Sequence, residues 1–187
     1  MTLPMTPSQT VGPFFGCCLC WPDAPYVVPE GTRKAFWVRG RVFDGAGAPV
    51  PDALVETWQA DHEGRFAHPD DPRGAVLSRD FRGFGRSATD AEGWFGVLTI
   101  KPGRFPDAQG QLQAPFLAVS VFARGLLDRV VTRIYFANEV EANQVDPLLS
   151  SLQDNPRRVT LLATADRDGY RFDVHLQGAH ETIFFAI

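Results

Sequence analysis

Hydrophobic and polar side chains alternate along several short segments of the chain, and this alternation predicts β-strands. The segment 35–43, AFWVRGRVF, alternates around Arg39 and Arg41 and precedes a run of turn-forming residues at 44–52. Residues 53–61, ALVETWQAD, are expected to form the returning strand. Further strands are expected in the segments 94–100, 116–125, 130–139 and 160–174, the last divided by a turn at 166–169.

The remaining segments do not show a strand pattern. Residues 62–93 are polar and rich in Gly, which predicts a long loop that is functional or faces a partner. Residues 138–153 favour a short helical turn or two, and no helix-period segment is long enough for a helical domain. Together these patterns predict an all-β fold, an antiparallel β-sandwich with long loops.

The N-terminal residues 1–30 are predicted to be an extended arm, and residues 31–187 the β-sandwich domain. Prolines interrupt the segments 6–15 and 21–31, and proline is excluded from helix interiors and central strands. Because the arm has little periodic apolar content, it is expected to lie on the surface of a partner chain.

The composition is that of an ordinary globular domain, with 44% of the 187 residues hydrophobic and 21% charged. The counts of Phe, Pro and Gly (15, 15 and 17) favour short strands joined by tight turns. A formal net charge of -4 gives no electrostatic support for binding to nucleic acid or to an anionic membrane. No apolar run has transmembrane length and no signal peptide is recognisable, so a cytoplasmic location is expected.

Three cysteines lie close together at Cys17, Cys18 and Cys20. An odd number without a secretion signal argues against a disulfide framework. A soft-metal site and a redox thiol are the functional alternatives, but no fourth ligand lies nearby in the sequence. The preferred interpretation is free thiols in a packed or interface segment. The four histidines are not expected to form a metal site either. His62 and His68 are expected to be solvated loop residues, and His175 and His180 to be structural residues.

The segments around residues 101–121, KPGRFPDAQGQLQAPFLAVSV, are similar to those of the intradiol ring-cleaving dioxygenases. The similarity is carried by TDAEGWFGVLTIKPG before this stretch, by RGLLDRVVTRIYFANE after it, and by TVGPFF near the N-terminus. It implies a core like those of transthyretin and the intradiol dioxygenases. No GxSxG, HExxH, GxGxxG or P-loop motif suggests other chemistry.

The resemblance implies that the iron ligands of catalytic family members are missing here. Such members hold Fe(III) with two tyrosines and two histidines, a donor set suited to a ferric ion. The corresponding positions are implied to be Phe66, Phe105, Leu117 and Val119, none of which has a lone pair, and Ala114 replaces a substrate-binding arginine. The loop before Pro115 is slightly shorter than in the family, so the last two positions could shift by one place. Such a shift adds no ligand, since the sequence has no His or Tyr between Phe105 and Ile134.

The resemblance therefore implies that this chain has no catalytic residue and binds no metal. It would form a hetero-oligomer with a homologous iron-bearing β chain, which holds Fe(III). The complex would use protocatechuate and dioxygen as substrates and open the ring to 3-carboxy-cis,cis-muconate, a step of aromatic catabolism in the β-ketoadipate pathway.

Several residues are implied to line the partner's substrate pocket: Thr10, Gly12, Pro13 and Phe14 in the arm, and Arg133 in the strand at 130–139. Arg133 could favour an anionic carboxylate on the substrate ring. The alternatives are that Phe14 and Phe15 only anchor the arm, and that Arg133 is a surface strand residue. Tyr135 is expected to pack in the sheet.

Two other functions remain open at this point. The chain could be a transthyretin-like binding module that uses the apolar cavity for a small aromatic ligand without catalysis. It could also be a purely structural homo-oligomer. Co-purification with an iron-bearing homologue would separate the subunit hypothesis from both.

Overall fold

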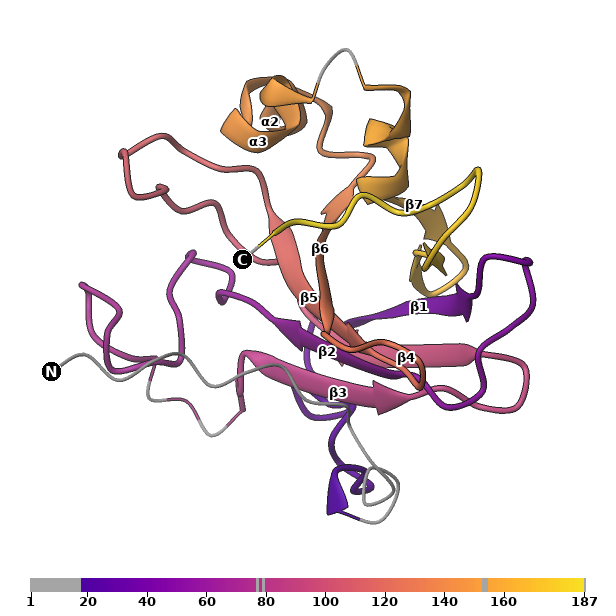
Figure 1. The fold of residues 1–187 in the computed structure, drawn as a ribbon. Coiled ribbons are helices and arrows are strands. Elements are labelled where there is room, and N and C mark those ends of the chain that lie inside the picture. Colours follow the sequence, from indigo (N-terminus) through magenta and orange to yellow (C-terminus); the bar gives the residue numbers. More distant parts are fainter. Residues whose placement is uncertain (1–17, 77, 79, 153–154, 187) are drawn as a thin grey trace, which may run out of the picture.

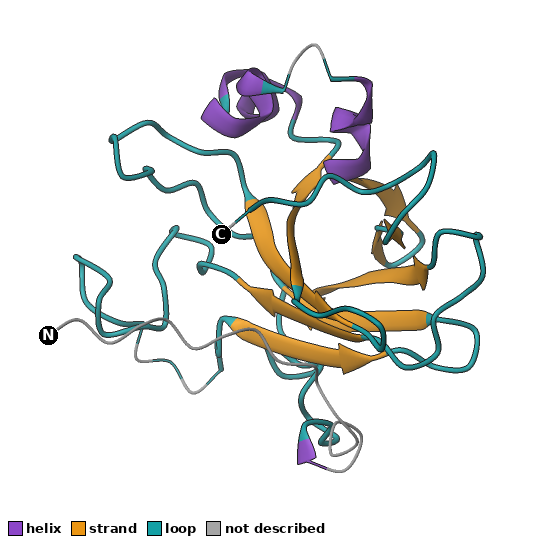
Figure 2. Ribbon diagram, viewed as in Figure 1, coloured by secondary structure: helices purple, strands orange, loops and turns teal. Residues whose placement is uncertain are grey.

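The alternating segments form strands in the computed structural model of the chain, which describes residues 18–76, 78, 80–152 and 155–186 (Figure 1). The strands are β1 (Phe36–Phe43), β2 (Leu54–Trp58), β3 (Phe84–Ala88), β4 (Trp94–Thr99), β5 (Phe116–Phe122), β6 (Val130–Phe136), β7 (Leu162–Asp166), β8 (Gly169–Arg171) and β9 (Val174–His175). The helices are α2 (Val140–Val145), α3 (Pro147–Ser151) and the 3-10 helix η1 (Pro156–Leu161). Figure 2 shows these helices gathered at one end of the strands. None in the described residues is long and apolar enough to cross a membrane.

The strands form a β-sandwich whose sheet is mixed. Their order is β3-β2-β5-β6-β7-β8-β1-β4, and β9 pairs with β1. β3, β2, β5 and β6 form one layer, β8, β1 and β4 form the other, and β7 pairs with a strand of each. β1 runs parallel to β8 and β9, and β6 parallel to β7. The predicted all-β sandwich is confirmed, with the correction that it is not purely antiparallel.

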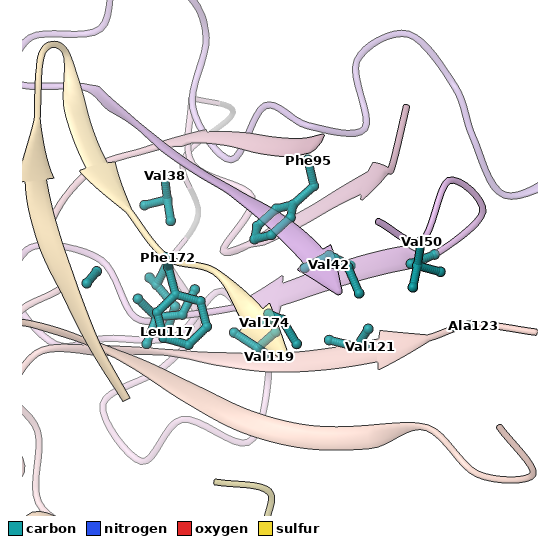
Figure 3. Close-up of a cluster of buried hydrophobic side chains, with 14 of the residues drawn as sticks. Val38, Val42, Val50, Phe95, Leu117, Val119, Val121, Ala123, Phe172 and Val174 are labelled. Atoms are coloured by element: carbon teal, nitrogen blue, oxygen red, sulfur yellow. The ribbon is translucent and has the colours of Figure 1, made fainter. Parts of the chain in front are cut away.

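The core lies between the two layers and is built from alternate residues of the strands. Val38 and Val42 of β1 face Leu117, Val119 and Val121 of β5, and all are 0–1% exposed (Figure 3). The intervening residues of β5 are less buried and point to the opposite face. This period of two is what the sequence alternation predicts for strands with one buried face.

The expected return of residues 53–61 beside β1 is wrong. β2 pairs with β3 and β5, whereas β1 pairs with β4, so the turn-rich link after β1 crosses between the layers. Alternation does not distinguish these arrangements, because Val42 and Val55 face the same core in either one.

β3 lies inside the segment that was predicted to be a loop. Its sequence, FGRSA, has small or polar residues at its buried positions, Gly85 and Ser87. A Cβ at Gly85 would lie 2.6 Å from Val97 Cγ1 and 2.9 Å from Val27 Cγ2, so close packing here requires glycine. The strand carries no apolar alternation, which explains why the sequence pattern missed it.

Residues 24–28 join the two outer strands, β3 and β4. The Val27 amide donates to the Leu98 carbonyl at 2.9 Å, and the Val27 carbonyl accepts from the Arg82 amide at 2.9 Å. The Arg86 amide of β3 donates to the Ala24 carbonyl at 2.8 Å. This segment therefore bridges the edges of both layers.

The same segment lies within the predicted N-terminal arm of residues 1–30. Val27 and Val28 are 0% and 2% exposed and pack in a cluster with Phe81, Val97 and Leu98 of this chain. Both valines are therefore packed within this chain. The arm of residues 1–30 on a partner chain stays a prediction, and its residues 1–17 lie outside the described ones.

Cys18 and Cys20 are exposed on this chain. The packed position expected for the cysteine cluster is therefore not found within the chain for these two, and an interface position stays a prediction. Cys17 lies outside the described residues.

Gly40 of β1 provides a test of the fold. A Cβ at this position would lie 1.6 Å from the carbonyl oxygen of Phe172, whose amide donates to the Arg39 carbonyl at 2.8 Å. Because backbone would have to move, Gly40→Ala should lower the free energy of unfolding by at least about 2 kcal/mol in urea denaturation.

Gly96→Ala is the matched control on the paired strand β4, where the nearest atoms to a Cβ are at 3.4 Å. The free energy of unfolding of that variant should stay within about 0.5 kcal/mol of the value for the unsubstituted chain. Equal stability of the two variants would contradict the close crossing of Phe172 over β1.

Candidate functional site

A cleft of about 560 Å³ lies on the face of β5 and β6 that points away from the sandwich core. Its walls come from distant parts of the sequence. Trp58 ends β2, Phe66 and Phe105 lie in loops, Phe116 and Ala118 belong to β5, and Arg133 belongs to β6. Leu148 of α3 and Phe185 of the C-terminal segment also line it. The cleft is therefore assembled by the fold as a whole.

Aromatic rings form a continuous row along the cleft. The ring centroids are 6.0 Å apart for Trp58 and Phe66, 4.9 Å for Phe66 and Phe105, and 5.4 Å for Phe105 and Phe116. These separations are within the range of favourable aromatic contacts, each of which contributes about 0.5–1.5 kcal/mol beyond area burial. The structure thus brings together Phe66 and Phe105, as expected for two of the missing-ligand positions.

The loop that carries Phe66 is held by the carboxylate of Asp71. The carboxylate accepts hydrogen bonds from the amides of Phe66 at 2.8 Å and Arg73 at 2.9 Å, and it also contacts the Arg73 guanidinium at 3.3 Å. The two amide hydrogen bonds, more than the arginine, lower the pKa of Asp71 from 3.8 to about 2. An ionised Asp71 therefore fixes the backbone at Phe66.

Gly64 allows the Phe66 loop to approach the Phe105 loop. It has a φ of +76°, and a Cβ there would lie 2.3 Å from the Arg104 carbonyl oxygen. The Gly103 amide donates to the Asp61 carbonyl at 2.7 Å, which joins the same two loops. Only glycine combines this left-handed backbone with such close contact.

The structure does not bring Leu117 and Val119 to this cleft. Both are in the core cluster between the layers, 0% and 1% exposed, on the opposite face of β5. Phe116 and Ala118 occupy the positions that face Phe105 and Phe66. Leu117 and Val119 therefore do not meet Phe66 and Phe105; Phe116 and Ala118, each one place earlier in the sequence, line the cleft instead. The replacements remain hydrocarbon side chains.

Arg133 supplies the charge in the cleft. Its guanidinium carbon lies 4.0 Å from the centroid of the Phe116 ring, a cation–π contact. Its Nη1 donates to Gln113 Oε1 at 2.9 Å and to the Tyr135 hydroxyl at 3.1 Å. Among the residues that the structure describes, no carboxylate forms an ion pair with it. Arg133 is thus oriented by neutral partners rather than neutralised.

Tyr135 and Asp146 support Arg133 from beneath. Both are 0% exposed, and the Tyr135 hydroxyl donates to Asp146 Oδ1 at 3.2 Å. Burial is the main cause that raises the pKa of Tyr135, and the negative charge of Asp146 adds to it against the lowering effect of Arg133. The phenol therefore stays neutral and acts as a donor. The expectation that Tyr135 packs in the sheet is confirmed.

The sequence pattern does not mark Phe116, Ala118, Gln113 or Asp146 as site residues. The alternation of FLAVSV gives two possible faces, and only the register of β5 selects the one with Phe116 and Ala118. Asp146 carried a recognisable signal, because an Asp before Pro is typical of a helix N-terminus. It caps α3 by accepting from the Leu149 amide at 2.9 Å.

The cleft residues do not fit a ferric ion. Phe66, Phe105, Phe116 and Ala118 offer no oxygen or nitrogen donor. Within the described part of the chain, no group of His, Cys, Asp and Glu side chains is arranged to hold a metal ion. His62 and His68 are exposed, as expected for solvated loop residues.

The arm residues implied to line a substrate pocket, Thr10, Gly12, Pro13 and Phe14, lie outside the described residues. Their role stays a prediction. Arg133 is described and lines the cleft of its own chain.

Comparison with known proteins agrees with the fold. A family model described as dioxygenase matches residues 27–178. The chain belongs to the intradiol dioxygenase family, whose members depend on iron.

Two relatives within the family are similar to this chain over most of its length. The chain is 41% identical over its full length, and 99% of the relative's length, to the protocatechuate 3,4-dioxygenase alpha chain of Burkholderia cepacia. It is 36% identical to the protocatechuate 3,4-dioxygenase beta chain of the same organism, over 82% of this chain and 68% of that one.

Solved structures share the fold. The dioxygenase domain of a carbohydrate-binding fusion protein from Streptomyces sp. SirexAA-E superposes with a TM-score of 0.59 at 28% identity, covering 93% of this chain and 99% of that one. Catechol 1,2-dioxygenase from Acinetobacter sp. ADP1 superposes with a TM-score of 0.63 at 21% identity, covering 82% of this chain and 56% of that one. The intradiol-type core expected from the sequence is therefore confirmed.

Asp71 gives the site a pH dependence that can be measured. Because its pKa is lower in the folded chain than the ordinary 3.8, its ionised form stabilises the fold above that pH, and the stabilisation is lost as the pH falls toward about 2. Asp71→Asn should melt at a lower temperature than the unsubstituted chain at neutral pH, and the difference should shrink below pH 3.8.

Asp70→Asn is the control, since the neighbouring side chain is 89% exposed. Its melting temperature should follow that of the unsubstituted chain at every pH. If the difference in melting temperature between Asp71→Asn and the unsubstituted chain stays constant down to pH about 2, the carboxylate charge does not hold the Phe66 loop.

Proposed function

We propose that this chain is the iron-free alpha subunit of a protocatechuate 3,4-dioxygenase, and that a homologous beta chain holds the Fe(III) and cleaves the ring. The observation that carries the proposal is the cleft itself. The fold of an iron-dependent family is kept, while the residues that meet in the cleft, Phe66, Phe105, Phe116 and Ala118, have hydrocarbon side chains. The full-length similarity to alpha chains supports the same assignment.

The chemistry explains why such a chain needs a partner. Intradiol cleavage requires a ferric ion held by oxygen and nitrogen donors, and these side chains provide neither. Arg133 and the buried Tyr135 do not replace them, because a guanidinium has no lone pair to donate and the Tyr135 hydroxyl is directed at Asp146. The role of this chain is therefore assembly and shaping of a pocket, with the ring-opening step left to the partner.

Exposed apolar side chains at the helical end of the molecule support an association surface. Val140 and Val145 of α2 and Val159 of η1 are 57%, 62% and 68% exposed. Apolar residues that gather in one surface region mark sites of protein contact, whereas singly exposed ones do not. The proposed partner for this surface is a homologous beta chain. The beta chain of Burkholderia cepacia is itself similar in sequence to this chain.

The contribution of this chain to the partner's pocket is part of the proposal. Thr10, Gly12, Pro13 and Phe14 would reach it through the N-terminal arm, and Arg133 would favour a substrate with a carboxylate. Protocatechuate, a catechol with one carboxylate, has this chemistry. A cytoplasmic location likewise stays a prediction.

Co-expression tests the subunit assignment. This chain and the candidate beta chain should co-purify, cleave protocatechuate with uptake of dioxygen, and contain iron in proportion to the beta chain alone. This chain purified by itself should contain no stoichiometric iron and no ring-cleaving activity. Activity with stoichiometric iron in this chain alone would overturn the proposal.

Arg133→Ala in the complex tests the role of the charge. The KM for protocatechuate should rise about 10-fold or more, the magnitude of a lost charge-assisted hydrogen bond, while the iron content stays the same. Arg129→Ala, an exposed arginine at the start of the same hairpin strand, is the control and should leave KM unchanged. An unchanged KM for Arg133→Ala would remove Arg133 from the partner's pocket.

A further inference from the structure

We infer that the cleft of this chain is itself a binding site, selective for a small aromatic carboxylate without ring hydroxyl groups, such as a benzoate. This site goes beyond the proposed function, because all of the residues that line it belong to this chain.

The size and walls of the cleft suit a single aromatic ring. Its volume of about 560 Å³ is within the range of small-molecule sites, and its lining is mainly apolar. Trp58, Phe66, Phe105 and Phe116 present ring faces and edges along its length. A flat ligand ring can add to this row by the same stacking and edge contacts.

One end of the row carries an oriented positive charge. Arg133 lies over Phe116 and uses Nη1 for Gln113 and Tyr135. Its Nε and Nη2 donate to no partner among the described residues, and no described carboxylate pairs with it. Arg39, Arg86 and Arg171, by contrast, each have an acidic partner. Arg133 is therefore available to a ligand carboxylate through a planar pair of N–H donors.

The Phe66 and Phe105 side chains in the row offer nothing to a hydroxyl group, because they have no polar atoms. The Trp58 indole beside Phe66 has one N–H donor and no acceptor for a hydroxyl hydrogen. The Gln59 amide already donates to the carbonyls of Ala60 at 3.1 Å and Ile100 at 2.9 Å, and its oxygen accepts from Thr99. The Thr132 hydroxyl donates to the Ile183 carbonyl at 2.7 Å. A ring hydroxyl placed here would lose its water and gain no partner.

These two ends together define the ligand class. A carboxylate anchored on Arg133 directs the opposite edge of the ring toward Phe105 and Phe66, where hydroxyl groups are disfavoured. The preference is the reverse of that of a metal site that binds hydroxyl oxygens. Loss of the ligand set thus changes what the cleft selects, rather than only removing an activity.

The test is a displacement titration with the purified full-length chain, using 4-fluorobenzoate as the probe and ¹⁹F NMR as the readout. Benzoate should displace the probe at a concentration about 10- to 100-fold lower than 3,4-dihydroxybenzoate, the range over which an apolar pocket rejects an added hydroxyl. No binding of the probe at millimolar concentrations, or equal or tighter binding of the dihydroxy compound, would overturn the inference.

Variants locate the site. Arg133→Gln should weaken probe binding at least about 10-fold through loss of the charge. Ala118→Phe should abolish binding by filling the cleft while Arg133 is kept. Arg129→Gln, which makes the same charge change outside the cleft lining, is the control and should bind normally.

Circular dichroism checks that each variant is folded. If a variant does not fold, the preference of the unsubstituted chain for benzoate over 3,4-dihydroxybenzoate still tests the inference. Undiminished binding by folded Ala118→Phe would place the probe elsewhere and overturn the inference. The outcome is independent of the partner: a chain that fails to co-purify with a beta chain can still bind benzoate, and an active complex can lack this binding.

Discussion

The buried carboxylate of Asp146 is the interaction on which the functional face of this chain depends. It is 0% exposed and accepts from the Ala114 amide at 2.8 Å, from the Leu149 amide at 2.9 Å and from the Tyr135 hydroxyl at 3.2 Å. A carboxylate taken out of water must be satisfied by such donors, so these groups are held together. Through them Asp146 connects the start of α3, the approach to β5 and the end of β6.

This arrangement explains how Arg133 can be half-buried without an ion pair. Its Nη1 contacts the Tyr135 hydroxyl, which donates to Asp146, so the negative charge acts on the guanidinium through a neutral phenol. The charge of Arg133 is moderated but not cancelled. A direct ion pair would have made the guanidinium unavailable to a ligand. The contact through the Tyr135 hydroxyl instead fixes the orientation of the Arg133 guanidinium and leaves its charge available.

The aromatic row also connects the loops of residues 66 and 105 to β5. The connection is direct packing of Phe66, Phe105 and Phe116, with Asp71 and Gly64 fixing the loop backbone. These contacts come from the side chains of the chain itself, unlike those of domains whose metal stabilises the native state.

The sequence predicted most of the strands, but not the pairing of strands or the register. β5, β6 and the β7–β8 hairpin follow from alternation and turn chemistry, and Phe66 and Phe105, which the resemblance singled out, do meet in the cleft. Alternation could not tell that β2 joins the other layer, because both arrangements bury Val55. It could not choose between Leu117 and Ala118 either, since a shift of one residue exchanges the two faces of a strand. β3 was missed because its buried positions, Gly85 and Ser87, carry no hydrophobic signal.

Residues 24–28 have a consequence for how the molecule avoids self-association. β3 and β4 end the strand order, and such terminal strands present unpaired amides and carbonyls that recruit other chains into intermolecular β-structure. Residues 24–28 form backbone hydrogen bonds to Arg82 and Arg86 on one side and to Leu98 on the other. They therefore cover the edges of both β3 and β4. A chain shortened past this segment would leave both edges open to pairing with other chains.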